Sequence, residues 1–568
     1  MGTTALPDSP GAFADATWDQ IRPHYDDLAR APLDHATAAD WLREWSRLEE
    51  SLTEAANLAH IAHTADTRDA ARAAHDRRFA AEIWPRAEAR RVHLSARLLD
   101  LGYAPPELAT TLRRFANRRA LFREENAPPL AALADLDGRY RELLGALTVD
   151  WDGASLTRAQ VRPFALAPER ATRERAFRAQ VAPLVARRDA FEDLFDRQLA
   201  LRQAVARNAG FRDYRDFAHR EKGRFDYTPD DCARFHAAVA TAVVPAVRRR
   251  LDRRRRLLGL AALRPWDTAH DPSGHPPLAP FADIAGLLGP AQAILAGVDP
   301  ALGDQVGLLR AEGLFDLASR VGKAPGGYSI ALPWRKRPFV FMNAAGTARD
   351  VEVLLHELGH AAHSLARFAA QPLFWQRDPG LEMNELAALA LELLAAPRLG
   401  REAGGYYAPA DARRARAEQL DTLLTLLPQY ALLDAFQQWA YTSPDRADRD
   451  ARDAAWRRLG ARFQPGVAWD GLAAEQAALR HGFFQLSLAP FYQIEYGFAQ
   501  VGALQLWRAS LGDRAGTVAR YRAALALGAT RPLPDLYAAA GARFGADART
   551  LGELVALVEA HLAALEHP

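Results

Sequence analysis

The segment LLHELGHAAH, from Leu354 to His363, carries three histidines and one glutamate in an otherwise apolar run. His356 and His360 are four residues apart, so on an α-helix both imidazoles lie on one face, where they can bind the same metal ion. Glu357 is then placed to act as a general base on a metal-bound water. This HExxH pattern indicates a zinc hydrolase. The alternative is a buried helix that carries polar side chains by chance.

A catalytic zinc needs a third protein ligand and keeps a fourth position open for water. In one large class of HExxH enzymes the third ligand is a histidine, but its position here is occupied by Ala366, so that pattern fails. Glu385 lies 25 residues after His360 in the helical pattern LEMNELAALALELL, and the segment between them contains prolines and a glycine that can turn the chain back. A second helix beside the first would present Glu385 to the metal. Glu382 is the alternative third ligand.

Further polar residues flank these candidates. Glu392 lies seven residues after Glu385, two turns along the same helix face. We expect its carboxylate to hydrogen-bond the second ring nitrogen of a ligating histidine, as is usual around bound zinc, and the alternative is a salt bridge at the rim. Glu352 and Asp350 are weaker candidates for that role. His363 is expected to pack near the site without binding the metal.

The elements that must position these residues are predicted to be mainly helices. Ala, Leu, Arg and Glu dominate the sequence, and apolar residues recur at spacings of three and four. The region GGYSIALPWRKRPFVFMN instead predicts two strands, Tyr328–Leu332 and Phe339–Met342, whose edge could pair with an extended peptide. Gly359 has no side chain, which would let another segment approach the motif helix closely.

The composition argues against several classes of function. Lys and Arg number 72 against 70 Asp and Glu, a net charge of +2, which gives no electrostatic reason to expect nucleic acid or a membrane as partner. The arginine-rich run 248–259 is predicted to be the solvated face of an amphipathic helix. No apolar run is long enough to span a membrane, and the N-terminus lacks the pattern of a secretory signal. The single cysteine, Cys232, permits no intrachain disulfide, so we expect a cytoplasmic protein.

Taken together, VEVLLHELGHAAHS and the following ELAALALE resemble the thimet oligopeptidase and oligoendopeptidase F family of zinc peptidases, in particular its oligoendopeptidase F branch. That family has HExGH, a ligand glutamate at this same separation and a second glutamate seven residues later. Other segments resemble it in the same order: REKGRFDYTPDDC, LRPWD, KAPGGY, RPFVFMN and PFYQIEYGFAQVGALQLW. The resemblance covers most of residues 200–510, and ATWDQIRPHYDDL near the N-terminus is a weaker match. Ala388 stands where relatives often carry serine.

The resemblance implies a mainly α fold: a large helical zincin-type body with a deep substrate channel and a small β element beside the active-site helix. Residues 1–195 would form one wall of the channel and residues 196–568 the catalytic region. It also implies one zinc per chain and an endopeptidase that hydrolyses short unfolded oligopeptides. Carried over onto this sequence, His481, Tyr492 and Tyr496 would contact the scissile carbonyl, with a tyrosine hydroxyl donating to the oxyanion.

The resulting hypothesis is a metalloendopeptidase with zinc on His356, His360 and Glu385 and a zinc-bound water activated by Glu357. Short peptides are the expected partners, without nucleic acid or membrane, and the oligomeric state is left open. Two competing hypotheses remain. One is a peptide-binding helical channel protein with little turnover, and the other is a zinc hydrolase of non-peptide amides.

Overall fold

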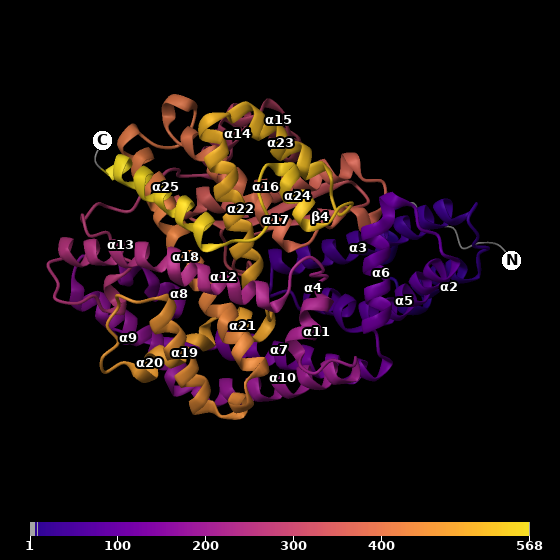
Figure 1. Ribbon diagram of the computed structural model, residues 1–568, viewed down its shortest axis with the longest axis horizontal. Coiled ribbons are helices and arrows are strands. Elements are labelled where there is room, and N and C mark those ends of the chain that lie inside the picture. Colours follow the sequence, from indigo (N-terminus) through magenta and orange to yellow (C-terminus); the bar gives the residue numbers. More distant parts are fainter. Residues whose placement is uncertain (1–5, 8, 567–568) are drawn as a thin grey trace.

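The computed structural model describes residues 6–7 and 9–566, so the ends of the two predicted regions, residues 1–5, 8 and 567–568, lie outside the described residues. Helices dominate, as predicted (Figure 1). The first group of helices is α1 (Gly11–Ala14), α2 (Trp18–Arg30), α3 (Ala38–Ala65), α4 (Ala70–Arg78), α5 (Trp84–Leu101) and α6 (Ala109–Leu121). The second is α7 (Ala127–Gly145), α8 (Arg158–Val161), α9 (Arg170–Ala186), α10 (Arg188–Asn208), α11 (Tyr214–Glu221), α12 (Pro229–Ala242) and α13 (Val244–Leu257).

The remaining helices surround the motif. They are α14 (Ile284–Val298), α15 (Pro300–Ala311), α16 (Ala348–Ala370), α17 (Leu381–Ala395), α18 (Pro409–Thr442), α19 (Arg449–Phe463), α20 (Ala473–Ala478), α21 (Phe484–Leu488), α22 (Gln493–Gly512), α23 (Arg514–Ala526), α24 (Leu533–Ala540) and α25 (Ala548–Glu566). The HExxH segment lies on α16, which packs against α17, and α17 packs in turn against α22. Figure 1 shows these three helices in the middle of the molecule, between the N-terminal helices and α25.

A small sheet precedes α16, with strand order β3-β5-β4. Strand β4 (Tyr328–Leu332) has the predicted bounds, and β5 (Arg337–Ala344) contains the second predicted strand and pairs with β4 antiparallel. Strand β3 (Phe315–Ala318) lies parallel to β5 and was not predicted. A separate hairpin of β1 (Thr148–Trp151) and β2 (Ala154–Thr157) was also not predicted.

Helices α16 and α17 cross where both carry a small residue, Gly359 on α16 and Ala388 on α17. A Cβ atom added to Gly359 would lie 2.5 Å from the Cα atom of Ala388, closer than packed atoms can approach. This confirms the expectation that Gly359 permits a close approach. The N-terminus of α16 is closed by a capping box, in which the Thr347 hydroxyl accepts from the Asp350 amide and the Asp350 carboxylate accepts from the Thr347 amide. Asp350 therefore acts as a cap and not as a partner of a histidine.

The helices of the first 195 residues lie in two different surroundings. Helix α3 packs against β4 and against the short helix η6 (Phe374–Arg377), where the rings of Trp45 and Trp375 lie 4.4 Å apart. Residues of α7 and α10 instead share a core with Tyr441 and Phe491. Helix α10 continues across residue 195 without a break, and the division into regions 1–195 and 196–568 stays a prediction.

The arginine-rich run forms most of α13, as a helix was expected there. Several of its arginines are paired: Arg249 contacts Glu559, and Arg250 contacts both Asp421 and Glu566. Part of the positive charge of this run is therefore neutralised by ion pairs within the fold. Among the described residues, no helix is both long and apolar enough to cross a membrane.

Candidate metal centre and active site

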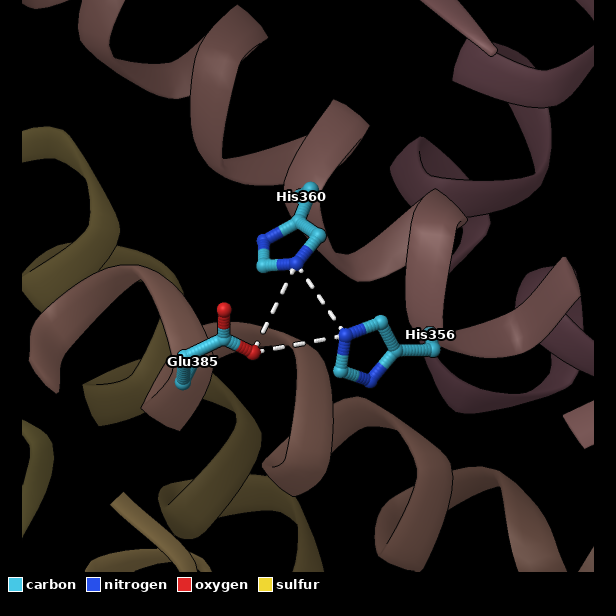
Figure 2. A group of neighbouring side chains, drawn as sticks. All are labelled: His356, His360 and Glu385. Carbon is cyan, nitrogen blue, oxygen red and sulfur yellow. Dashed lines mark hydrogen bonds and ion pairs between the residues drawn. The ribbon is translucent and has the colours of Figure 1, made fainter. Parts of the chain in front are cut away.

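Three side chains from α16 and α17 converge on one point. The Nε2 atoms of His356 and His360 are 3.1 Å apart, and the Oε2 atom of Glu385 lies 3.4 Å from the first and 3.7 Å from the second. Figure 2 shows the three ligand atoms facing one another. Within residues 6–7 and 9–566, this is the one group of His, Cys, Asp or Glu found close enough together to hold a metal ion.

The chemistry of this group fits zinc. Two imidazole nitrogens and a carboxylate oxygen are ligand atoms that zinc accepts, and a tetrahedral site with bonds of about 2.0–2.1 Å would separate them by about 3.3 Å. The Oε2 atom of Glu385 is buried and makes no close hydrogen bond, since its nearest polar neighbours are the two imidazole nitrogens at 3.4 and 3.7 Å, and such a state is costly unless something else satisfies the atom. A cation between the three side chains would satisfy it, so the residues present fit the metal that the sequence predicts.

Each histidine of the cluster is held by a second contact. The Nδ1 atom of His356 lies 2.7 Å from Oε1 of Glu392, and an Nδ1–H there donates to the carboxylate. His360 makes its second hydrogen bond with the backbone of Asn384, in the first turn of α17. These contacts leave both Nε2 atoms turned toward Glu385. Burial lowers the pKa of His356, but Glu385 and Glu392 outweigh it and hold that pKa well above its usual value.

Glu357 lies on the same helix and is buried. The backbone amide of Ser329, on the edge strand β4, hydrogen-bonds its carboxylate, and its Oε2 atom has no hydrogen-bond partner. Burial raises the pKa of Glu357 to about 7, although the neighbouring His356 opposes the shift. A carboxyl group with a pKa near neutrality can both accept and release a proton. The role of Glu357 as a base stays a prediction, with which this pKa is compatible.

Two tyrosines complete the group from the side of α22. Tyr492 occupies the position just before this helix and Tyr496 lies in its first turn, with their hydroxyl oxygens 2.9 Å apart. The Tyr492 hydroxyl also lies 3.4 Å from Oε1 of Glu385. Burial, followed by the charge of Glu385, raises the pKa of each tyrosine, so both stay protonated as hydrogen-bond donors. The structure thus brings both predicted tyrosines to the cluster.

The structure does not bring His481 to this group. Its ring stacks on Phe191 at 5.2 Å, its Nε2 atom lies 3.5 Å from Glu192, and its carbonyl accepts a hydrogen bond from Tyr140. All of these partners lie on α7 and α10. Its position is explained by packing between these helices and the short helix η10 (Leu479–Gly482) that carries it.

Three more acidic or imidazole side chains of α16 and α17 lie outside the cluster. Glu382 accepts a hydrogen bond of 2.5 Å from the Tyr227 hydroxyl, so it is not the third ligand of the group. His363 is buried, with burial holding its pKa well below the usual value, and it is not part of the cluster either. Glu352 pairs with Arg349 at 2.7 Å. Of the candidates for supporting a histidine, the structure places Glu392 in contact.

Sequence reasoning missed three residues around the site. Ser329 and Asn384 act through their backbones, which no side-chain motif reveals. The ring of Tyr430, on α18, lies 5.7 Å from that of Tyr496, and burial, followed by the charges of Glu385 and Glu392, raises the pKa of Tyr430. Tyr430 lies inside the long helix α18, where an aromatic residue is the ordinary sign of a core position.

Comparison with known proteins identifies the family. The sequence model described as peptidase family M3 matches residues 164–275 and 301–554, and the model of the peptidase M3 N-terminal domain matches residues 12–110. A search of curated proteins finds no match.

Solved structures agree over nearly the whole chain. PZ peptidase A with an inhibitor is 22% identical with a TM-score of 0.88, covering 97% of this chain and 99% of that one. A protein described as oligoendopeptidase F is 25% identical with a TM-score of 0.85, covering 98% and 99%. Another so described, from Bacillus anthracis str. Ames, is 21% identical with a TM-score of 0.83, covering 97% and 96%. These matches confirm the predicted resemblance and the mainly α fold, and the chain belongs to peptidase family M3.

Proposed function

We propose that this protein is a zinc-dependent endopeptidase that hydrolyses short unfolded oligopeptides. The observation that carries the proposal is the convergence of His356, His360 and Glu385 at 3.1–3.7 Å, with Glu357 beside them on α16. Membership of peptidase family M3 supports peptide hydrolysis, and similar structures are named PZ peptidase A and oligoendopeptidase F.

His356, His360 and Glu385 would hold one zinc ion, with Glu392 fixing the orientation of the His356 ring. Bound zinc supplies Lewis-acid chemistry, which lowers the pKa of a water molecule and polarises a carbonyl group. Glu392 would keep one proton of His356 on Nδ1, and a metal ion bound at Nε2 would take the place of the second proton.

Glu357 transfers a proton from the attacking water to the leaving amine. Its carboxylate takes a proton from the attacking water as the new C–O bond forms, and it delivers that proton to the amine as the C–N bond breaks. Its buried position gives it a pKa of about 7, which suits both transfers. Tyr492 and Tyr496, whose hydroxyls lie beside Glu385 and each other, would donate a hydrogen bond to the oxyanion that develops on the carbonyl oxygen.

The substrate backbone would lie along the edge of β4, where the sheet meets α16. Two groups on this strand are already engaged: the Ser329 amide with Glu357, and the Ala331 carbonyl with the side-chain amide of Asn57 at 2.7 Å. Because these two groups are not available to a peptide, an added strand would form backbone hydrogen bonds with only a short part of this edge. A short extended peptide suits such a contact. We retain the cytoplasmic location predicted from the single cysteine, Cys232, as part of the proposal.

A mixed library of short peptides, analysed by mass spectrometry before and after incubation, tests this function. We expect internal cleavage that a zinc chelator abolishes and that added zinc restores. The Glu357→Gln variant should bind zinc and leave the library intact. Retention of peptides without cleavage would favour a binding protein, and hydrolysis of small amides but not of peptides would favour the amide hydrolase.

A further inference from the structure

The residue just before Tyr492 has an unusual backbone. Phe491 has φ of +61°, in the left-handed region that side-chain-bearing residues rarely adopt. Two other non-glycine residues share this property within the described part of the chain, Asp152 and Lys336, and both are exposed. Phe491 by contrast is fully buried and packs against Tyr441. A buried aromatic residue keeps such a conformation only where its surroundings impose it.

Two side chains hold the backbone of Phe491 from both sides. The Phe491 amide donates to Oε1 of Gln437 at 3.0 Å, and the Phe491 carbonyl accepts from Nη2 of Arg224. The same Nη2 atom lies 2.5 Å from Oε1 of Glu495. The Arg224 side chain is 1% exposed and that of Glu495 2%, so this contact is sheltered from water.

The guanidinium of Arg224 thus links two points on either side of Tyr492. One is the carbonyl directly before Tyr492, and the other is Glu495 in the first turn of α22. A return of Phe491 to negative φ would change the direction in which the chain enters α22, and it would move the Tyr492 side chain with it. The Tyr492 hydroxyl now lies 2.9 Å from that of Tyr496 and 3.4 Å from Glu385.

We propose that Arg224 is a positioning residue, which holds Phe491 in the left-handed conformation and so directs the Tyr492 hydroxyl toward Glu385. Arg224 belongs to REKGRFDYTPDDC, a segment distant in sequence from the metal centre, and it makes no contact with the three ligands in the described structure. The part of this inference that concerns turnover rests on the function proposed above, and the part that concerns the tyrosine does not.

The position of Tyr492 can be measured without activity. We suggest introducing 3-fluorotyrosine at position 492 and recording ¹⁹F NMR spectra of the full chain with and without added zinc. The parent protein should give one narrow resonance. Arg224→Lys should shift or split it, because a lysine ammonium cannot replace a guanidinium that bridges a carbonyl and a carboxylate. Gln437→Ala removes the hydrogen bond to the Phe491 amide and should change the same resonance. This second variant tests the proposal if Arg224→Lys does not fold.

A matched control is Arg91→Lys, which makes the same change at another buried ion pair, with Glu49 in the N-terminal helices. It should leave the resonance at position 492 unchanged. An unaltered resonance in both Arg224→Lys and Gln437→Ala would overturn the proposal, as would an equal change in Arg91→Lys.

A double-mutant cycle tests the consequence for catalysis. Loss of one oxyanion donor should lower kcat of Tyr492→Phe about 100-fold. Misplacement of that donor should lower kcat of Arg224→Lys about 10-fold, with KM within about threefold of the parent value. In the Tyr492→Phe background, Arg224→Lys should cost less than about twofold, because the group it positions is gone.

Independent, multiplying losses would show that Arg224 acts by another route and would overturn the proposal. Full activity of Tyr492→Phe would overturn the part of the proposal that concerns turnover, while leaving the peptidase assignment and the NMR test of position 492 intact. If the parent protein cleaves no peptide, the proposed function fails, and the NMR comparison still decides whether Arg224 positions Tyr492.

Discussion

The α16–α17 pair and the segment 480–496 both bring polar side chains into the interior, but they hold them by different means. In the helix pair, regular backbones cross closely at Gly359 and Ala388, and helix spacing decides which side chains face one another. In the segment 480–496 the chain is broken into short helical pieces with a left-handed residue at Phe491, and it is fixed by charged contacts such as that of Arg224 with the Phe491 carbonyl. Substitutions should therefore act through packing in the first region and through polar contacts in the second.

The largest effect is expected at Glu357, which lies in the regular α16–α17 pair. Glu357→Gln keeps the size of the side chain but removes the base, so kcat should fall about 10³–10⁴-fold. Zinc content should be unchanged because Glu357 is not one of the three converging residues. Hydrolysis of a quenched fluorescent peptide, with metal analysis of the same sample, measures both. Activity similar to the parent protein would remove Glu357 as the base.

A smaller effect is expected at Glu392, which supports a ligand without contacting the metal. Glu392→Gln should weaken zinc binding about 10–100-fold, because the ring of His356 loses its charged hydrogen-bond partner. Competition with a chelator of known affinity gives the change. Glu352→Gln is the matched control, since Glu352 pairs with Arg349. An equal loss in both variants would contradict a specific role for Glu392.

The close crossing of the two helices predicts an effect on stability. Gly359→Ala places a methyl group 2.5 Å from the Cα atom of Ala388, so we expect a loss of about 1–3 kcal/mol in the free energy of unfolding. Gly138→Ala is the control, because that helical glycine has no atom within 4 Å of the added Cβ and should gain about 0.5–1 kcal/mol. Urea unfolding measures both. Equal responses would mean that the crossing is looser than described.

The smallest effect concerns His481 in the irregular segment. Burial, followed by the charge of Arg480, holds the pKa of His481 well below its usual value in the folded protein. The unfolded chain binds a proton there near pH 6.5, so the stability contributed by neutral His481 is present above that pH and falls by about 1.4 kcal/mol per unit below it.

His481→Gln should therefore make the urea midpoint less sensitive to pH between 7.5 and 5.5. His275→Gln removes an exposed imidazole and serves as the control. Identical pH profiles for the parent protein and His481→Gln would argue against this buried, neutral histidine.

The two regions also differ in how far the sequence predicts them. Helical spacing placed His356, His360, Glu385 and Glu392 on facing surfaces, and β4 was predicted with its observed bounds. These predictions depend on local periodicity, which one sequence contains. Strand β3 was missed because its four residues pair with β5 from outside the hairpin.

The segment 480–496 shows where the sequence is insufficient. Tyr492 and Tyr496 were predicted from the family resemblance, but the path of the chain before them depends on Arg224 and Gln437 from distant elements. No local sequence pattern predicts a left-handed backbone conformation at Phe491. The surroundings of His481 likewise come from α7 and α10, whose packing the sequence did not predict.

The most direct test of the metal centre compares the two glutamates at the start of α17. Glu385→Gln and Glu382→Gln are the same change three residues apart, and both side chains are buried. After exhaustive dialysis, metal analysis should find about one zinc per chain in the parent protein and in Glu382→Gln, and little in Glu385→Gln. Retention of zinc by Glu385→Gln together with its loss from Glu382→Gln would contradict the centre formed by His356, His360 and Glu385.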